Sequence, residues 1–203
     1  MRNVGYVLWF CGLPGSGKTT IARGVNEKLQ GSSAQRWTLV SMDSVRQKIF
    51  PNPSYSDDER DAAYRALVII ASLLSQNDVS VILDATGHKK VWRDLARKEC
   101  SRFIEIYVKC PVAICIARET KRIDETSPIR TRLYLDALDR LQTGKKIEGL
   151  GKVPGVDEPF EGSESPEIVL DSSISNPEAL IEKTLRKLAQ LVPEIFSTNA
   201  DVS

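Results

Sequence analysis

The stretch Gly12-Leu13-Pro14-Gly15-Ser16-Gly17-Lys18-Thr19 decides the fold of this chain, because it fits the pattern G-x-x-x-x-G-K-[ST] at every fixed position. Glycines in such a loop let backbone N–H groups turn inward around an anion, and a helix that begins near Lys18 adds its N-terminal dipole. Lys18 is expected to reach the β- and γ-phosphates of a nucleoside triphosphate, and the Thr19 hydroxyl is expected to contact Mg²⁺. The loop therefore predicts a nucleotide site without naming the reaction.

The residues around this loop predict alternating strands and helices. Residues 4–10 form a short apolar run typical of a strand buried on both faces, and apolar residues recur at helical spacing from 21 to 29. Further strands are expected at 37–40, 79–83, 103–108 and 168–170, and further helices at 57–76, 91–100, 111–118 and after the N-cap Asn176. Alternating strands and helices form a parallel sheet covered on both sides. The predicted fold is α/β, a P-loop NTPase three-layer α/β/α sandwich whose five strands take the nucleoside-kinase-like order 2-3-1-4-5.

Length and charge limit the classes of protein. A chain of 203 residues with 41% apolar residues is long enough for one substantial core, so a single domain over 1–203 is expected. The formal net charge of +1 argues against a protein that holds long nucleic acid by neutralising phosphates. No stretch approaches the roughly 20 apolar residues that cross a bilayer. The four cysteines (Cys11, Cys100, Cys110 and Cys115) lack metal-ligand spacing, which predicts reduced thiols in a cytoplasmic protein.

Two late segments are expected to cover the site. Arg118, Lys121, Arg122, Arg130 and Arg132 crowd a short stretch after the fourth predicted strand. Mobile basic residues over phosphates stabilise transition-state charge and exclude water, so a mobile lid is predicted at about 118–145, with an ordinary solvated helix as the alternative. Residues 144–166 hold five glycines and three prolines, too many for regular structure, and are predicted to form a substrate-covering loop.

Two acidic residues follow the second and third predicted strands. Asp43 and Arg46 form an Asp-x-x-Arg unit, which suits an acceptor hydroxyl that needs a carboxylate and an anionic acceptor that needs a guanidinium. Asp84 ends an apolar strand, as an acid that supports the Mg²⁺ hydration shell does. Each could instead cap a following helix or turn. We predict that Lys18, Asp43 and Asp84 are catalytic, and that Thr19, Asp43 and Asp84 bind the metal.

Taken together, these residues resemble the adenylylsulfate (APS) kinase family, which phosphorylates the ribose 3′-hydroxyl of adenosine 5′-phosphosulfate to make PAPS. The likeness lies in residues 12–20, in Asp43-Ser44-Val45-Arg46, and in residues 154–161 followed by Ser165-Pro166-Glu167. Residues 155–161 follow the family's particular G-[VI]-D-x-P-[YF]-E segment. The resemblance implies ATP and Mg²⁺ as cofactors, APS as the small nucleotide-like acceptor, and a role in sulfate assimilation. The sequence does not give the oligomeric state, and a homodimer stays open.

The resemblance also implies roles for single residues. Arg118 resembles the arginine that lies against the ATP adenine, Tyr55 with Ser56 resembles the family's Phe-Ser, and Arg65 falls where an acceptor-binding arginine is expected. Tyr134 and Ala137 resemble the lid's Tyr-x-x-Ala. The predicted nucleotide-binding residues are those from Gly12 to Thr20 together with Arg118. The predicted acceptor-binding residues are Asp43, Arg46, Tyr55, Arg65, Thr86, Gly87, Lys121 and Phe160.

The chain departs from the family pattern at three places. The usual Ser-Pro-Tyr-Arg run reads Asp84-Ala85-Thr86-Gly87-His88-Lys89-Lys90, extra residues stand at about 123–132, and Ser44 replaces the usual asparagine. These changes leave the acceptor open. One alternative is a related P-loop kinase that acts on another small nucleotide-like or sugar metabolite or on a polynucleotide 5′ end, which the balanced charge disfavours. A second alternative is an ATP-dependent switch without a separate acceptor.

Overall fold

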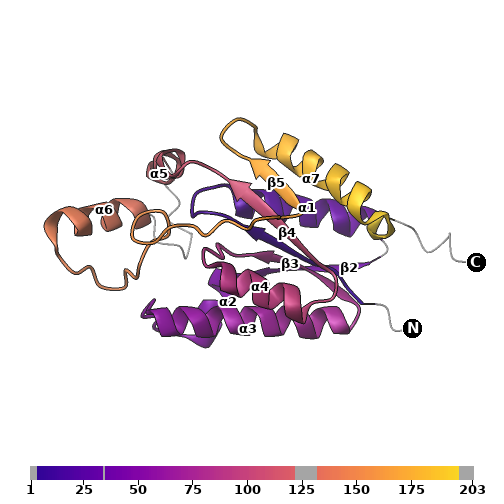
Figure 1. The fold of residues 1–203 in the computed structure, drawn as a ribbon, viewed down its shortest axis with the longest axis horizontal. Coiled ribbons are helices and arrows are strands. Elements are labelled where there is room, and N and C mark those ends of the chain that lie inside the picture. The colour runs from indigo at the N-terminus through magenta and orange to yellow at the C-terminus, as the bar shows by residue number, and fades with distance from the viewer. Residues whose placement is uncertain (1–3, 34, 122–131, 197–203) are drawn as a thin grey trace, which may run out of the picture.

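The computed structural model describes residues 4–33, 35–121 and 132–196. Its strands form a parallel sheet in the order β2-β3-β1-β4-β5 (Figure 1). Their bounds are β1 Val7–Cys11, β2 Arg36–Ser41, β3 Val79–Asp84, β4 Phe103–Lys109 and β5 Ile168–Asp171. The predicted α/β class and strand order are therefore confirmed.

Helices cover both faces of this sheet. They are α1 Lys18–Ser32, α2 Met42–Ile49, α3 Asp57–Gln76, α4 Lys90–Glu99, α5 Val112–Thr120, α6 Leu133–Thr143 and α7 Pro177–Leu191, followed by the 3₁₀ turn η1 Pro193–Ile195. Figure 1 shows α1 and α7 over one face and α3 and α4 over the other. The three predicted layers are thus present among the described residues.

The central strand β1 explains why the layers form. Its side chains alternate between the faces of the sheet, as the two-residue period of a strand requires. Leu8 and Phe10 pack in the apolar cluster with α1 and α7, whereas Val7 and Trp9 pack in the cluster with α3 and α4. All four side chains are fully buried. A strand that is apolar at every position is therefore what a sheet covered on both faces needs.

The strand ends bring distant parts of the chain to one edge. In the parallel register, Asp84 at the end of β3 pairs with Ser41 of β2 on one side and with Phe10 of β1 on the other. The phosphate loop follows β1, and Asp43 lies in the first turn of α2, directly after β2. The carboxyl edge of three neighbouring strands thus carries all three predicted catalytic residues, as is usual for sites in open α/β sheets.

Some local expectations differ from the structure. The helix α6 was not predicted, and a helix after β2 was named only as the alternative role of Asp43; the N-cap of that helix, α2, is Ser41 and not Asp43. Pro111 precedes α5 as its N-cap instead of opening it, and β2 is longer than residues 37–40. Asp57–Gln76 is helical over the range expected, with Ser56 as its N-cap.

Residues 122–131, which include Arg122 and Arg130 of the predicted lid, lie outside the described residues. Across the described ranges, no helix combines the length and apolar character needed to cross a membrane.

Candidate active site

A large cavity of about 1350 Å³ opens at the carboxyl edge of the sheet. One side is formed by the phosphate loop, from which Pro14, Gly15 and residues 17–20 line the cavity. The other side is formed by α2, the start of α3, the turn after β3, and residues 149–154 of the predicted covering loop. The cavity therefore joins the predicted phosphate site to the predicted acceptor region.

The phosphate loop is held close to its neighbours. A Cβ atom on Gly15, whose φ is +76°, would come within 2.8 Å of the Cys115 carbonyl oxygen, so only glycine fits there. The Ser16 carbonyl oxygen accepts a hydrogen bond from Ser172 Oγ at 2.7 Å, and Pro14 O accepts one from Tyr134 Oη at 2.9 Å. Tyr134 and Ala137 are fully buried beside α5, so the two resembling lid residues are part of an apolar cluster.

Asp84 and Thr19 meet beneath this loop. Asp84 is 6% exposed, and its Oδ1 atom has no hydrogen-bond partner among the described residues. Burial raises the pKa of the Asp84 carboxyl, with a smaller rise from Asp43, while Lys18 and the Thr19 hydrogen bond act in the opposite direction. No group of three or more His, Cys, Asp and Glu that could cage a metal occurs in the described parts of the chain. A buried carboxylate oxygen without a partner, beside a hydroxyl, nevertheless fits a hydrated divalent cation whose other ligands are phosphates and water.

The predicted pair of Asp43 and Arg46 lies on the acceptor side of the cavity. Arg46 is buried, and its Nη1 atom is 2.6 Å from Glu59 Oε1. The Arg46 guanidinium lies 5.0 Å from the centroid of the Tyr55 ring. Burial favours a higher pKa for Glu59, but hydrogen bonds from Ser54 and Arg46 outweigh it and hold the pKa below its usual value. Asp43, Arg46 and Tyr55 all line the cavity, so the structure brings three predicted acceptor residues together.

Arg60, and not the predicted Arg65, is among the residues that line the cavity. The Arg65 side chain is 59% exposed and its Nε atom pairs with Asp61 Oδ2 at 2.6 Å; neither residue lines the cavity. Arg60 lines the cavity, is 7% exposed and donates to the Lys152 carbonyl oxygen at 2.7 Å. The signal was present in the sequence, because position 60 shares the helical spacing of the buried Tyr64 and Leu67.

The other predicted acceptor residues are divided. Thr86 lines the cavity, whereas Gly87, Lys121 and Phe160 are not among its lining residues. Gly87 has a φ of +55° and its N–H donates to Tyr64 Oη at 2.8 Å. Phe160 stacks on Tyr107 with ring centroids 5.0 Å apart. Arg118 lines the cavity and donates to the Ser172 carbonyl oxygen at 2.6 Å, next to the phosphate loop.

His88 was not among the predicted site residues, yet it lies in the cavity wall. It is 2% exposed, and its Nε2 atom is 2.9 Å from Glu158 Oε2 in the covering loop. Burial lowers the pKa of His88 to about 4, although Glu158 acts to raise it. The imidazole is therefore neutral near pH 7. Its position as the one histidine of the sequence was a signal, but its partner was not visible.

A sheet in the order 2-3-1-4-5, with a phosphate loop after the central strand and carboxylates at the ends of the next two strands, defines a P-loop kinase. Comparison with known proteins then makes the assignment narrower. The sequence model of the adenylylsulphate kinase family matches residues 4–171. The chain therefore belongs to the adenylylsulphate kinase family, whose members are ATP-dependent kinases.

Individual relatives support this assignment over nearly their whole length. The chain is 35% identical over 167 residues to a probable adenylyl-sulfate kinase of Archaeoglobus fulgidus, covering 82% of this chain and 96% of the relative. It is 32% identical over 187 residues to one of Pyrococcus abyssi, covering 92% and 97%. The solved structure of the Mycobacterium tuberculosis APS kinase CysC, in complex with AMPPNP and APS, matches with a TM-score of 0.72 at 24% identity, covering 92% and 99%. That last likeness shows the shared fold.

Proposed function

We propose that this chain transfers the γ-phosphoryl group of ATP to the 3′-hydroxyl of adenosine 5′-phosphosulfate, giving PAPS and ADP. One observation carries the proposal for this chain in particular. The cavity that is lined by the phosphate loop is lined on its far side by Arg46, Arg60 and Tyr55. Two guanidinium groups suit the anionic phosphosulfate, and an aromatic ring suits the adenine.

Lys18, Thr19 and Asp84 serve the phosphate side in this proposal. Lys18 and the loop N–H groups bind the β- and γ-phosphates, and Arg118 borders the nucleotide. Thr19 and Asp84 would hold Mg²⁺, which when bound neutralises charge on the phosphate oxygens. The unpartnered Asp84 oxygen beside Thr19 supports this assignment. ATP dependence comes with the family, whereas the magnesium ion belongs to the proposal.

Asp43 serves the acceptor in this proposal. It lies in the first turn of α2, lines the cavity and is close enough to Asp84 to affect the pKa of that carboxyl. Its carboxylate orients the attacking hydroxyl and accepts its proton, while Arg46 and Arg60 hold the acceptor's anionic group. Arg60 replaces Arg65 in this role because Arg65 faces solvent.

Replacement of Asp43 by asparagine tests the proposed chemistry. We expect Asp43→Asn to lower kcat for APS by at least about 100-fold, because the amide keeps the shape but accepts no proton. The KM for ATP should stay within about twofold of wild type. Asp58→Asn is the matched control, since Asp58 is exposed and is not a lining residue. Steady-state kinetics with near-normal kcat in Asp43→Asn would remove this role.

The acceptor itself is tested by a turnover panel. Wild-type protein with ATP and Mg²⁺ is assayed with APS, with other small nucleotides and sugars, and with a polynucleotide 5′ end. Preference for APS is expected, and ATP hydrolysis that is independent of every acceptor would favour a switch instead.

The four free cysteines support a reducing, cytoplasmic compartment. Light scattering would decide whether the protein forms a homodimer.

A further inference from the structure

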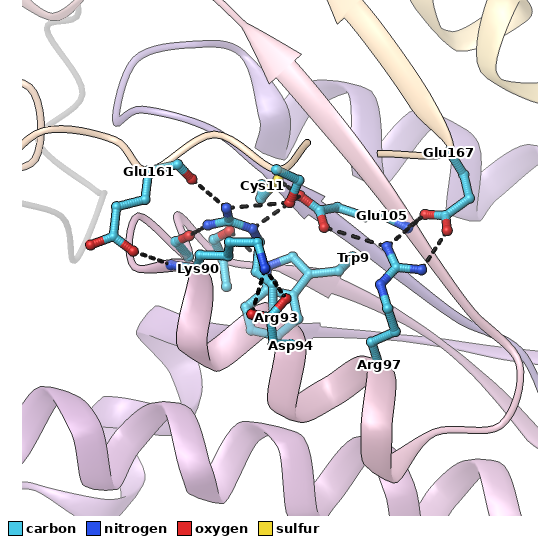
Figure 2. A network of polar contacts seen from close by, with 12 residues as sticks. Trp9, Cys11, Lys90, Arg93, Asp94, Arg97, Glu105, Glu161 and Glu167 are labelled. Carbon is cyan, nitrogen blue, oxygen red and sulfur yellow. Dashed lines mark hydrogen bonds and ion pairs between the residues drawn. The ribbon is translucent and has the colours of Figure 1, made fainter. Parts of the chain in front are cut away.

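Arg93 of α4 lies at the centre of a buried polar network beside the cavity (Figure 2). Its side chain is fully buried, and its Nε atom donates to Glu105 Oε1 of β4 at 3.0 Å. Its two terminal nitrogens donate to the carbonyl oxygens of Gly87 and Glu161. One guanidinium thus joins the turn after β3 to the covering loop, two segments that are far apart in the sequence.

Glu105 holds the other side of this network. It is 2% exposed, and its Oε1 atom also accepts a hydrogen bond from Ser163 Oγ at 2.6 Å. Its Oε2 atom is 3.6 Å from Nη2 of Arg97, which lies one turn further along α4. Ser163 belongs to the covering loop, so both members of the buried ion pair contact that loop.

The Arg93 network is better suited to fixing geometry than to raising stability. Removing two charges from water costs several kcal/mol, so a buried ion pair is weak evidence for stabilisation. The planar guanidinium, in contrast, fixes the directions of several hydrogen bonds at once. Here those directions set the distance between two carbonyl oxygens, one in the turn after β3 and one in the covering loop.

Both joined segments carry residues of the cavity wall. The turn contributes Thr86 and His88, and the loop contributes residues 149–154. Glu158 of the loop is not a lining residue, but it contacts His88 at 2.9 Å and Arg60 at 3.5 Å, and both of these line the cavity. A backbone hydrogen bond from Glu161 N to His88 O at 2.8 Å also joins the covering loop to the turn after β3. A shift of the loop relative to the turn would therefore move Arg60, the group expected to hold the acceptor.

We propose that Arg93 is a positioning residue for the acceptor site: through its bonds to Gly87, Glu161 and Glu105 it holds the covering loop against the turn after β3. The proposal rests on the proposed kinase function, because it assigns the acceptor to this side of the cavity. Arg93 itself is not one of the lining residues, so it acts through Arg60 and His88.

The test compares two arginines on the same helix. Arg93→Lys keeps the charge beside Glu105, but an ammonium group does not reproduce the fork that reaches two carbonyl oxygens. We expect the KM for the acceptor to rise by about tenfold or more, while the KM for ATP stays within about twofold. In Arg97→Lys, the matched control, both constants should stay within about twofold, because Arg97 contacts Glu105 and Glu167 only at a partly exposed site.

Three measurements keep the outcomes separate. An unchanged acceptor KM in Arg93→Lys, or equal losses for both substrates, overturns the proposal. If Arg93→Lys does not fold, Ser163→Ala decides, since it removes the contacts of Ser163 Oγ with Glu105 and with Arg93 and should raise only the acceptor KM, by roughly two- to threefold. All kinetics use whichever acceptor the wild type phosphorylates, so failure with APS refutes the proposed function alone. Deuterium exchange at residues 85–88 and 158–163 should be faster in Arg93→Lys than in Arg97→Lys, and equal rates contradict the anchoring role.

Discussion

At the scale of single residues, Asp84 illustrates a conflict between stability and function. Its carboxyl group is buried, one oxygen lacks a partner among the described residues, and burial raises its pKa. The ionised form is therefore costly in the nucleotide-free protein, yet it is the form that can hold a cation.

Asp84→Asn should consequently separate the two properties. We expect the nucleotide-free protein to become more stable, by roughly 1 kcal/mol, because the buried charge is removed. We expect kcat to fall by at least about 100-fold, since the cation site is weakened. Thermal unfolding without ligand and steady-state kinetics check both, with the exposed Asp94→Asn as control. A variant that loses stability and activity together would contradict this account.

The residue scale also shows where sequence reasoning reached its limit. The role of each residue in the phosphate loop could be predicted, because the residues that define the motif occupy eight adjacent positions of the sequence. Arg65 was assigned to the acceptor from the family resemblance, and Arg60 was not considered; in the structure the Arg65 side chain is 59% exposed, whereas Arg60 lines the cavity. His88 and Glu158 are 70 residues apart, and a contact of that kind is set by the folded sheet and not by any local pattern.

At the scale of elements, the start of α3 is organised around one carboxylate. Ser56 caps the helix by accepting from Glu59 N at 3.2 Å. Glu59 Oε2 in turn accepts from Tyr55 N at 3.1 Å, while Oε1 contacts Arg46 at 2.6 Å. Glu59 therefore joins α2, the preceding loop and α3, and it holds Arg46 in the cavity wall.

Glu59→Gln should lower the stability of the folded protein by an amount that depends on pH. We expect a loss of about 2 to 4 kcal/mol at pH 7, because Arg46 is left buried beside a neutral amide. The hydrogen bonds lower the pKa of Glu59 in the folded protein below its ordinary value of 4.5. Its stabilising contribution is thus complete above pH 4.5 and is lost as the pH falls through the lower folded-state pKa. Urea unfolding at several pH values should show the difference from wild type shrinking in acid, and a constant difference would contradict the role.

Elements themselves were predicted unevenly. Long elements such as α3 and the apolar strand β1 carry clear periodic patterns, and both were found within a few residues of their expected bounds. No sequence pattern predicted the helices α2 and α6, because their few buried side chains pack against distant parts of the chain. Met42 and Val45 of α2 belong to one apolar cluster, and Tyr134 and Ala137 of α6 belong to another. Such short helices gain their stability from tertiary packing, which a local pattern does not contain.

At the scale of the whole molecule, charge is balanced in sum but not in space. The formal net charge is +1, yet the described cavity lining holds seven Lys or Arg residues and three Asp or Glu residues. A concave basic wall focuses its field on incoming anions, and salt screens that field. The molecule can therefore attract a small dianionic acceptor without the basic surface that long nucleic acids require.

Salt should accordingly affect capture more than chemistry. Raising KCl from about 20 to 300 mM shortens the screening length severalfold, so kcat/KM for the acceptor is expected to fall by roughly three- to tenfold. The kcat value should change less than about twofold, because bound groups are shielded from the salt. Arg132→Gln, at the exposed rim of the cavity, should reduce this salt dependence, whereas Lys98→Gln on the outer face of α4 should not. If kcat fell in parallel with kcat/KM, salt would be acting on the bound state, and the focusing role of the cavity would be wrong.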